Sequence, residues 1–215
     1  MAKELHASFI PDIYAGDSLS GLSTALDKLE KHPIANLLWT DTGYFPEVSF
    51  TAAHTDHGIA LKYFVKEQHT AAVYTTVNDP VYKDSCVEFF IGFDADGSYY
   101  NLEFNALGTA LAGYGINRHG RQEVPAVNVA KIKALSNIQL ADSNETLNTW
   151  DLTLLIPFDV FVYHNITTLK DRECQVNFFK CGDDLPQPHF LSWSNIPNPN
   201  PDFHLPGFFG RLKFV

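Results

Sequence analysis

Short apolar runs separated by turn residues recur along most of this chain, and they constrain its fold more than any other feature. Each run has the length of an ordinary strand, and the segment 94–98, Asp-Ala-Asp-Gly-Ser, is a hairpin turn between two of them. The expected strands cover residues 57–66, 71–77, 87–93, 99–106, 150–156, 175–180 and 208–214. This spacing predicts an all-β fold, an antiparallel β-sandwich of roughly ten strands.

One segment near the N-terminus is typical of a helix. Ser18 or Ser20 can cap a helix that runs to about His32, and Pro33 would end it. The apolar residues on its inner face would be Leu22, Ala25, Leu26 and Leu29. No repeat or linker divides the rest of the chain, so residues 1–215 are predicted to form a single domain.

Composition narrows the range of partners. Fifteen basic and 25 acidic residues give a formal net charge of −10, which disfavours nucleic acid as a partner. No apolar run approaches the roughly 20 residues of a membrane helix. The N-terminus lacks a basic region followed by an apolar run, which favours a cytoplasmic location, or a periplasmic or secreted one if the N-terminus has been processed. The three cysteines form no C-x-x-C pair and are expected to be buried and free.

The segment 99–106 alternates strictly between apolar and polar residues. Tyr100, Leu102, Phe104 and Ala106 are expected to face the core, and Tyr99, Asn101, Glu103 and Asn105 the other side. A row of amide and carboxylate groups offers both donors and acceptors, which suits a ligand rich in hydroxyl groups. An ordinary solvated sheet face is the alternative interpretation.

A second polar feature lies just upstream. Glu88 stands in the middle of an apolar strand, where a buried carboxylate needs a partner or a ligand. Tyr82 precedes that strand and could offer its ring to a sugar. Arg118 and Arg121 could pair with Glu88 or Glu103, or could bind ligand hydroxyls instead.

These motifs, in this order, resemble the family 9 carbohydrate-binding modules, and in particular the family-9-like proteins of Bacteroidetes. The resemblance extends from about Trp39 to the C-terminus. The segments that carry it are Tyr82, Asp84-Ser85-Cys86-Val87-Glu88-Phe89-Phe90, 99–105, Gly108, 150–158, 177–183, 190–194, 201–204 and 208–210.

The resemblance implies a DOMON-like β-sandwich that binds sugars without catalysis, the sugar ring being held between two aromatic side chains. By motif position, Glu88 is the hydroxyl-binding glutamate and Tyr82 the first aromatic. Trp193 is the expected second aromatic, whereas Trp39 and Trp150 are expected to belong to the core or its cover. The remaining expected ligand-binding residues are Arg118, preferred over Arg121, and Asn101, Glu103 and Asn105 on the strand below the site.

The resemblance also implies partners. The ligand would be a mono- or oligosaccharide, and the protein would support polysaccharide degradation beside a separate glycoside hydrolase. Family 9 modules carry structural calcium, but Asp94, Asp96 and Ser98 match only the start of a calcium loop and are interpreted as a turn. A calcium site built from other loops stays open, and no cofactor is otherwise expected.

Two enzymatic or redox alternatives remain. A glycoside hydrolase could use Glu88 and Glu103 on neighbouring strands, because paired carboxyl groups about 5 Å or about 6.5–9.5 Å apart support hydrolysis. A haem or redox protein of the DOMON type would need an axial Met or His, and Met1 is the only methionine. Sugar binding is ranked first, hydrolysis second and haem binding third.

Overall fold

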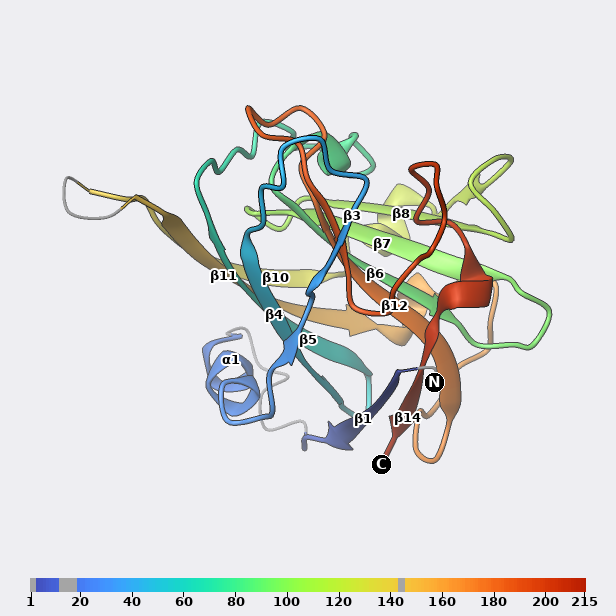
Figure 1. The fold of residues 1–215 in the computed structure, drawn as a ribbon. Coiled ribbons are helices and arrows are strands. Elements are labelled where there is room, and N and C mark those ends of the chain that lie inside the picture. The colour runs from blue at the N-terminus through green and yellow to red at the C-terminus, as the bar shows by residue number, and fades with distance from the viewer. Residues whose placement is uncertain (1–2, 12–18, 143–145) are drawn as a thin grey trace.

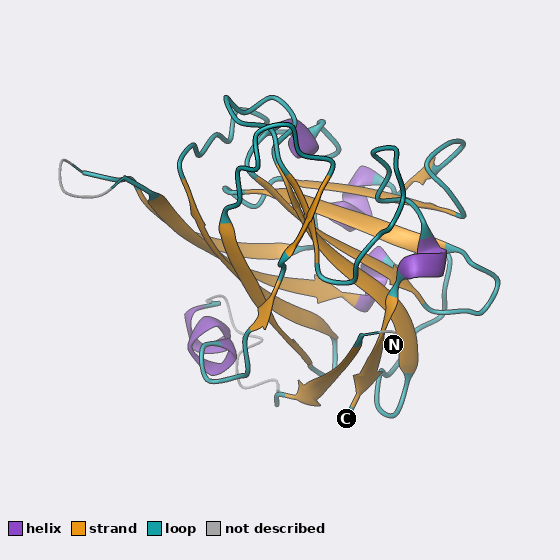
Figure 2. Ribbon diagram, in the orientation of Figure 1, coloured by secondary structure: helices purple, strands orange, loops and turns teal. Residues whose placement is uncertain are grey.

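Strands dominate the computed structural model, which describes residues 3–11, 19–142 and 146–215 (Figures 1 and 2). The strands in these residues are β1 Glu4–Phe9, β2 His32–Pro33, β3 Asn36–Leu38, β4 Glu47–His54, β5 Gly58–Glu67, β6 Cys86–Gly92, β7 Tyr99–Asn105, β8 Ala110–Gly115, β9 Gln122–Glu123, β10 Lys133–Gln139, β11 Asn148–Pro157, β12 Glu173–Cys181, β13 Phe190–Ser192 and β14 Gly210–Phe214. The helices are α1 Ser20–Leu26 and α2 Ala126–Val129, with short 3₁₀ helices at Val81–Lys83, Phe158–Val160 and Pro206–Phe208.

The strands form one curled sheet that folds into two layers. Its order is β10-β11-β5-β4-β1-β14-β12-β6-β7-β8-β9, with β2 beside β4, and with β13 joining β12 to β3. β1 pairs in parallel with β14 at one end and with β4 at the other, so it carries the sheet from one layer to the next. Apart from β1, neighbouring strands are antiparallel, and the predicted antiparallel β-sandwich is confirmed.

Alternating side chains place the core between the layers. The inward residues of β5 are Ile59, Leu61, Tyr63 and Val65, and those of β7 are Tyr100, Leu102 and Phe104. All of them belong to one buried cluster, as their period of two predicts. At its centre the rings of Phe50 and Phe178, from opposite layers, stack with centroids 3.7 Å apart.

The N-terminal helix is shorter than expected. It ends at Leu26 rather than near His32, because His32 and Pro33 form β2 against β4. Ser20 is its first helical residue and the N-cap is Leu19, with no side-chain capping bond. The alternative cap, Ser18, lies outside the described residues.

Two further predictions for local structure have different outcomes. Residues 71–77 form no strand, because side chains of the next segment bind their backbone: Ser85 accepts from Ala71 N, and Asp84 accepts from Val73 N and Tyr74 N. The predicted turn at 94–98 does connect β6 to β7, and Gly97 has a φ of 83° there. Asp96 Oδ1 accepts bonds from both the amide and the hydroxyl of Ser98, so this carboxylate closes the turn.

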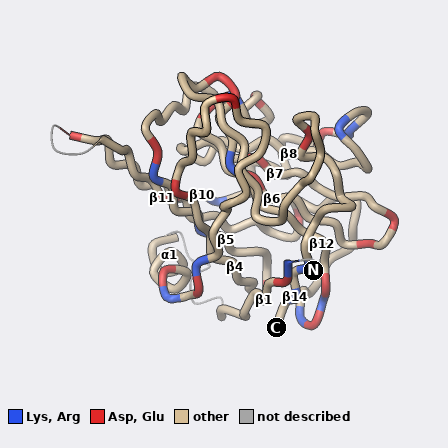
Figure 3. Tube along the Cα trace, in the orientation of Figure 1, with Lys and Arg blue, Asp and Glu red and all other residues tan. Residues whose placement is uncertain are grey.

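Charges are spread over the fold rather than grouped. Figure 3 shows Lys and Arg scattered among acidic residues, with no continuous basic stripe in this view. Among the helices that the structure describes, none has both the length and the apolar character needed to cross a membrane.

Candidate functional site

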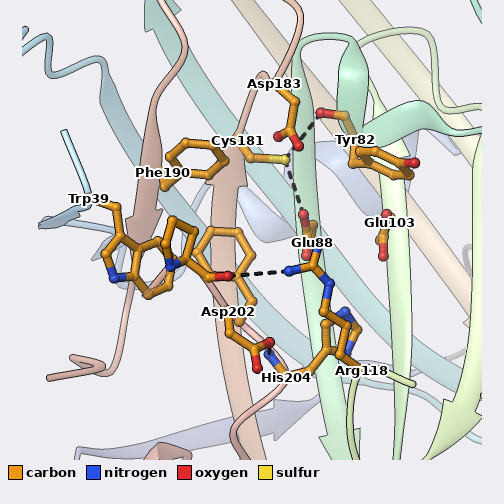
Figure 4. Close-up of a pocket in the computed structure, with 12 residues that line it drawn as sticks. Trp39, Tyr82, Glu88, Glu103, Arg118, Cys181, Asp183, Phe190, Asp202 and His204 are labelled. Atoms are coloured by element: carbon orange, nitrogen blue, oxygen red, sulfur yellow. Dashed lines mark hydrogen bonds between the residues drawn. The ribbon is translucent and has the colours of Figure 1, made fainter. Parts of the chain in front are cut away.

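A cavity of about 330 Å³ opens on the outer face of the layer that contains β6, β7 and β12 (Figure 4). Loops from distant parts of the chain surround it, since its walls come from the segments after β3, before β6, after β8 and after β13. It is lined by Trp39, Tyr82, Glu88, Glu103, Arg118, Cys181, Asp183, Phe190, Pro201, Asp202, Phe203 and His204.

The floor follows from strand register. Glu88 of β6 lies directly opposite Glu103 of β7, and Cys86 of β6 lies opposite Cys181 of β12. Because alternate residues share a face, the polar residues that the sequence places outside the core meet here. They are covered rather than solvated, and the exposed fractions of Glu88 and Glu103 are only 3% and 5%.

The two glutamates are buried beside each other, and neither forms an ion pair within the part of the chain that the structure describes. Burial, and secondly the charge of Glu103, raises the pKa of Glu88 well above its ordinary range. Burial raises the pKa of Glu103 to about 7, against the opposing effect of a hydrogen bond from Asn101. Across the described residues, no ion pair joins Arg118 or Arg121 to either glutamate. Close to neutral pH the floor can therefore both donate and accept hydrogen bonds.

Aromatic rings stand on two sides of this floor. Trp39, Phe190 and Phe203 form one wall, with the Trp39 ring centroid 5.5 Å from that of Phe203 and 6.2 Å from that of Phe190. Trp39 is held by a bond from Nε1 to Asn198 O, and its φ of 43° turns the chain there. Tyr82, 36% exposed on its 3₁₀ helix, lies on the other side of the cavity in Figure 4.

Arg118 is the predicted arginine that reaches the cavity. It lies in the loop after β8, and its Nη1 donates to Pro201 O at 3.2 Å, which links two loops at the rim. Arg121 is used elsewhere: it donates to Asn101 Oδ1 and Tyr99 O, and its guanidinium lies 4.4 Å from the centre of the Tyr99 ring.

The two predicted asparagines lie beside the cavity and do not line it. Asn101 donates to Glu103 Oε1 at 2.8 Å and so orients that carboxylate from below. Asn105 donates to Asp84 Oδ2 and Tyr74 O, which anchors the segment leading to Tyr82. In this structure both asparagines therefore bond other protein groups beside the cavity, and their direct contact with a ligand stays a prediction.

The expectation for Trp193 also needs correction. This residue is 3% exposed and packs edge-on against Phe50 and Phe178 in the core between the layers. It follows β13, and Gly210 lies so close to its ring that a Cβ atom at that position would collide with it. Trp193 therefore cannot offer a face to a ligand, whereas Trp39, expected to cover the core, lines the cavity.

Sequence reasoning also missed part of the wall. Phe190 and Phe203 come from the proline-rich region near the C-terminus, where the sequence shows aromatic residues but not their direction. His204, whose place in a proline-rich loop of the sequence already suggests a ligand contact, also lines the cavity. His204 accepts or donates at Nδ1 with the Tyr99 hydroxyl, 2.9 Å away, and burial lowers its pKa to about 3. It is therefore neutral at physiological pH.

A second buried charged cluster lies on the opposite face of β12. Lys180 Nζ forms an ion pair with Glu67 Oε2 at 2.9 Å, and lies 2.8 Å from His189 Nε2. Trp150 Nε1 donates to Glu67 Oε1 at 2.7 Å. Lys180 and Glu67 are completely buried, and their partners come from both layers, so this cluster ties the sandwich together.

Comparisons with known proteins agree with this architecture. The model of carbohydrate-binding family 9 matches residues 21–214. A candidate carbohydrate-binding protein from Bacteroides uniformis ATCC 8492 has 35% identity and a TM-score of 0.90, with 100% of both chains covered. No curated protein matches the chain.

Two more distant structures share the fold. Both are family 9 carbohydrate-binding modules from Caldicellulosiruptor kristjanssonii. One, in complex with glucose, has 9% identity and a TM-score of 0.63 over 99% of this chain and 96% of its own. The other, in complex with cellotriose, has 10% identity and a TM-score of 0.61 over 99% and 93%. With the family model matched over nearly its whole length, this chain belongs to carbohydrate-binding family 9.

Proposed function

We propose that this protein binds carbohydrate without catalysis, in the cavity above β6 and β7. The observation that carries the proposal is the combination of aromatic walls with a floor of two buried carboxyl groups that form no ion pair among the described residues. At about 330 Å³ the cavity lies near the lower end of the range for small-molecule sites, roughly 300–1,000 Å³, which favours a single terminal sugar over a long chain segment.

Each part of the cavity has a role in this proposal. Tyr82 and Trp39 hold the two apolar faces of the sugar ring, since aromatic rings bury such surface well. Glu88 and Glu103 bond the hydroxyls from below, and Arg118 from the rim. Asn101 acts through Glu103 by holding its carboxylate.

The related structures hold glucose and cellotriose, so these two sugars head the list of ligands to test. We further propose that the protein acts beside a separate glycoside hydrolase in polysaccharide degradation. A non-catalytic binding module would hold the polymer that such an enzyme cleaves. A structural calcium ion remains an expectation from the family.

Hydrolysis by Glu88 and Glu103 is the alternative function. The two residues are opposite each other, which is the observation in its favour. However, hydrolysis needs one ionised carboxylate beside one protonated acid, and burial raises the pKa of both groups here. Hydrogen bonding to sugar hydroxyls does not require the two glutamates to differ in protonation state, so it fits this pair better than hydrolysis does.

Titration calorimetry against mono- and oligosaccharides tests the proposal, with calcium and then with a chelator. We expect saturable binding that Tyr82→Ala weakens about tenfold or more, with the sugars recovered intact. Tyr163→Ala is the matched control, because Tyr163 is 41% exposed and lies outside the cavity lining. Absence of binding to any sugar, or equal losses in both variants, would contradict the proposal. Cleavage products that disappear in Glu88→Gln would support the hydrolase instead.

A further inference from the structure

Two thiols and a carboxylate meet at the floor of the cavity. Donor atoms of Cys86, Glu88 and Cys181 all lie within 4.8 Å of one another, and the three residues are buried. Strand pairing fixes this arrangement: Cys86 and Cys181 are cross-strand partners of β6 and β12, and Glu88 follows Cys86 on the same face of β6. Glu88 and Cys181 also line the cavity, so solvent reaches the cluster through it (Figure 4).

A second observation, an unbonded carboxylate oxygen, also points to a cation site. Glu103 lines the same cavity opposite Glu88, and its Oε2 is buried with no hydrogen-bond partner. The bond that Glu88 Oε1 does receive comes from the Cys181 thiol, 3.1 Å away, which is a weak donor. Two carboxyl groups are thus buried at one point with little to satisfy them, which costs free energy unless a cation binds there.

The donor set selects the kind of cation. Thiolates favour zinc and similar thiophilic divalent ions, whereas calcium and magnesium prefer oxygen ligands alone. Tetrahedral zinc with sulfur and oxygen ligands places its donors roughly 3.5 Å apart. The donor atoms of this cluster all lie within 4.8 Å of one another, and Cys181 Sγ and Glu88 Oε1 are already 3.1 Å apart, so small side-chain rotations suffice to bring them to one metal ion.

We propose that Cys86, Glu88 and Cys181 bind one thiophilic divalent cation of the zinc class, with Glu103 as the nearest fourth ligand. On binding, the two thiols and any protonated carboxyl group among the ligands release their protons to solvent. The two positive charges of the cation then balance the two thiolates, and each ligating carboxylate gains a bond to the metal. The two thiols take no part in the proposed sugar contacts, whereas Glu88 and Glu103 belong to both the metal site and the cavity floor.

The test is a zinc titration of the full chain, with any affinity tag removed and in the presence of a non-thiol reductant. Competition with a chromogenic chelator gives stoichiometry and affinity, and substitution with Co²⁺ reports sulfur ligation through its charge-transfer absorption. We expect one equivalent per chain, at least tenfold weaker in Cys86→Ser, Cys181→Ser and Glu88→Gln, with sulfur ligation visible in the unmodified chain.

Cys174→Ser is the matched control. Cys174 is also buried and lies on β12 like Cys181, but it is outside the cluster, so its variant should bind zinc as tightly as the unmodified chain. Failure to take up zinc would overturn the proposal. So would uptake that survives Cys86→Ser and Cys181→Ser, or a Co²⁺ spectrum without sulfur ligation. The Co²⁺ spectrum is recorded on the unmodified chain, so poor folding of a variant does not affect it. Sugar binding is tested separately with Tyr82→Ala, so a failure of the metal proposal can be told from a failure of the sugar proposal.

Discussion

The two faces of the layer that contains β6, β7 and β12 differ in how their buried ionisable groups are compensated. On the inner face Lys180 faces Glu67, and His189 and Trp150 complete the bonding. On the outer face Glu88 and Glu103 lie opposite each other, and no ion pair involves either of them among the described residues. A compensated cluster stabilises the join between layers, and an uncompensated one retains its capacity to bind a ligand. The difference separates a structural cluster from a functional one.

Breaking the compensated cluster should have the largest effect. Lys180→Met leaves Glu67 buried without its cation, so the free energy of unfolding should fall by about 3–5 kcal/mol. Chemical denaturation measures this change, and adding Glu67→Gln to the same chain should restore much of the loss. Lys83→Met, which removes a surface ion pair with Asp184, is the control and should change little. Equal effects of the two lysine variants would show that the buried Lys180–Glu67 pair contributes no more to stability than a surface ion pair.

Acid should weaken the same cluster. Burial, and secondly the charge of Lys180, lowers the pKa of His189 to about 4, so the unfolded chain binds a proton there more readily than the folded chain. Stability from this group is complete above about pH 6.5 and declines as the pH falls toward 4, with a loss of about 2 kcal/mol by pH 5. In His189→Gln, the change in unfolding free energy between pH 7 and pH 5 should be smaller by that amount. An unchanged pH dependence would show that His189 is not the sensitive group.

Trp39 in the cavity and Trp193 in the core should respond differently to substitution. Trp39→Ala should weaken sugar binding about tenfold, or about 1.4 kcal/mol, because it removes one wall of the cavity. Trp193→Phe should lower the thermal unfolding midpoint, since the ring packs in the core, but should leave sugar affinity unchanged. Loss of sugar binding in the Trp193 variant alone would restore the original expectation for that residue.

The smallest effect is expected at Glu103. Replacing it by Gln removes a buried, uncompensated carboxyl group and keeps an oxygen that can accept the Asn101 bond. The free energy of unfolding at pH 7 should therefore stay within about 1 kcal/mol of the original value, or rise. Denaturation beside Lys180→Met measures this directly, and a loss as large as that of the lysine variant would mean that Glu103 is a structural residue.

The sequence predicts the strands and polar residues that follow a local pattern. Alternation along β7 identifies Glu103, and an acidic residue inside an apolar strand identifies Glu88. Residues 71–77 have a β-forming composition but form no strand, because their backbone N–H groups donate hydrogen bonds to the side chains of Asp84 and Ser85.

Features that depend on contacts between residues far apart in the sequence could not be predicted. Trp39 lines the cavity because of the direction of its loop, whereas Trp193 is buried because it packs in the core around Phe50. The sequence near each tryptophan does not reveal this difference in exposure. The meeting of Cys86 and Cys181 likewise depends on the register between β6 and β12, which no short-range pattern reveals.

One measurement tests the central claim, that the uncompensated carboxyl pair is the sugar site. Glu88→Gln is titrated with the tightest-binding sugar of the set, and its unfolding free energy is measured in the same buffer. The account predicts an affinity at least about tenfold lower with stability unchanged or higher, since a buried carboxyl group is replaced by a neutral isostere. Unchanged affinity, or a parallel loss of affinity and stability, would contradict it.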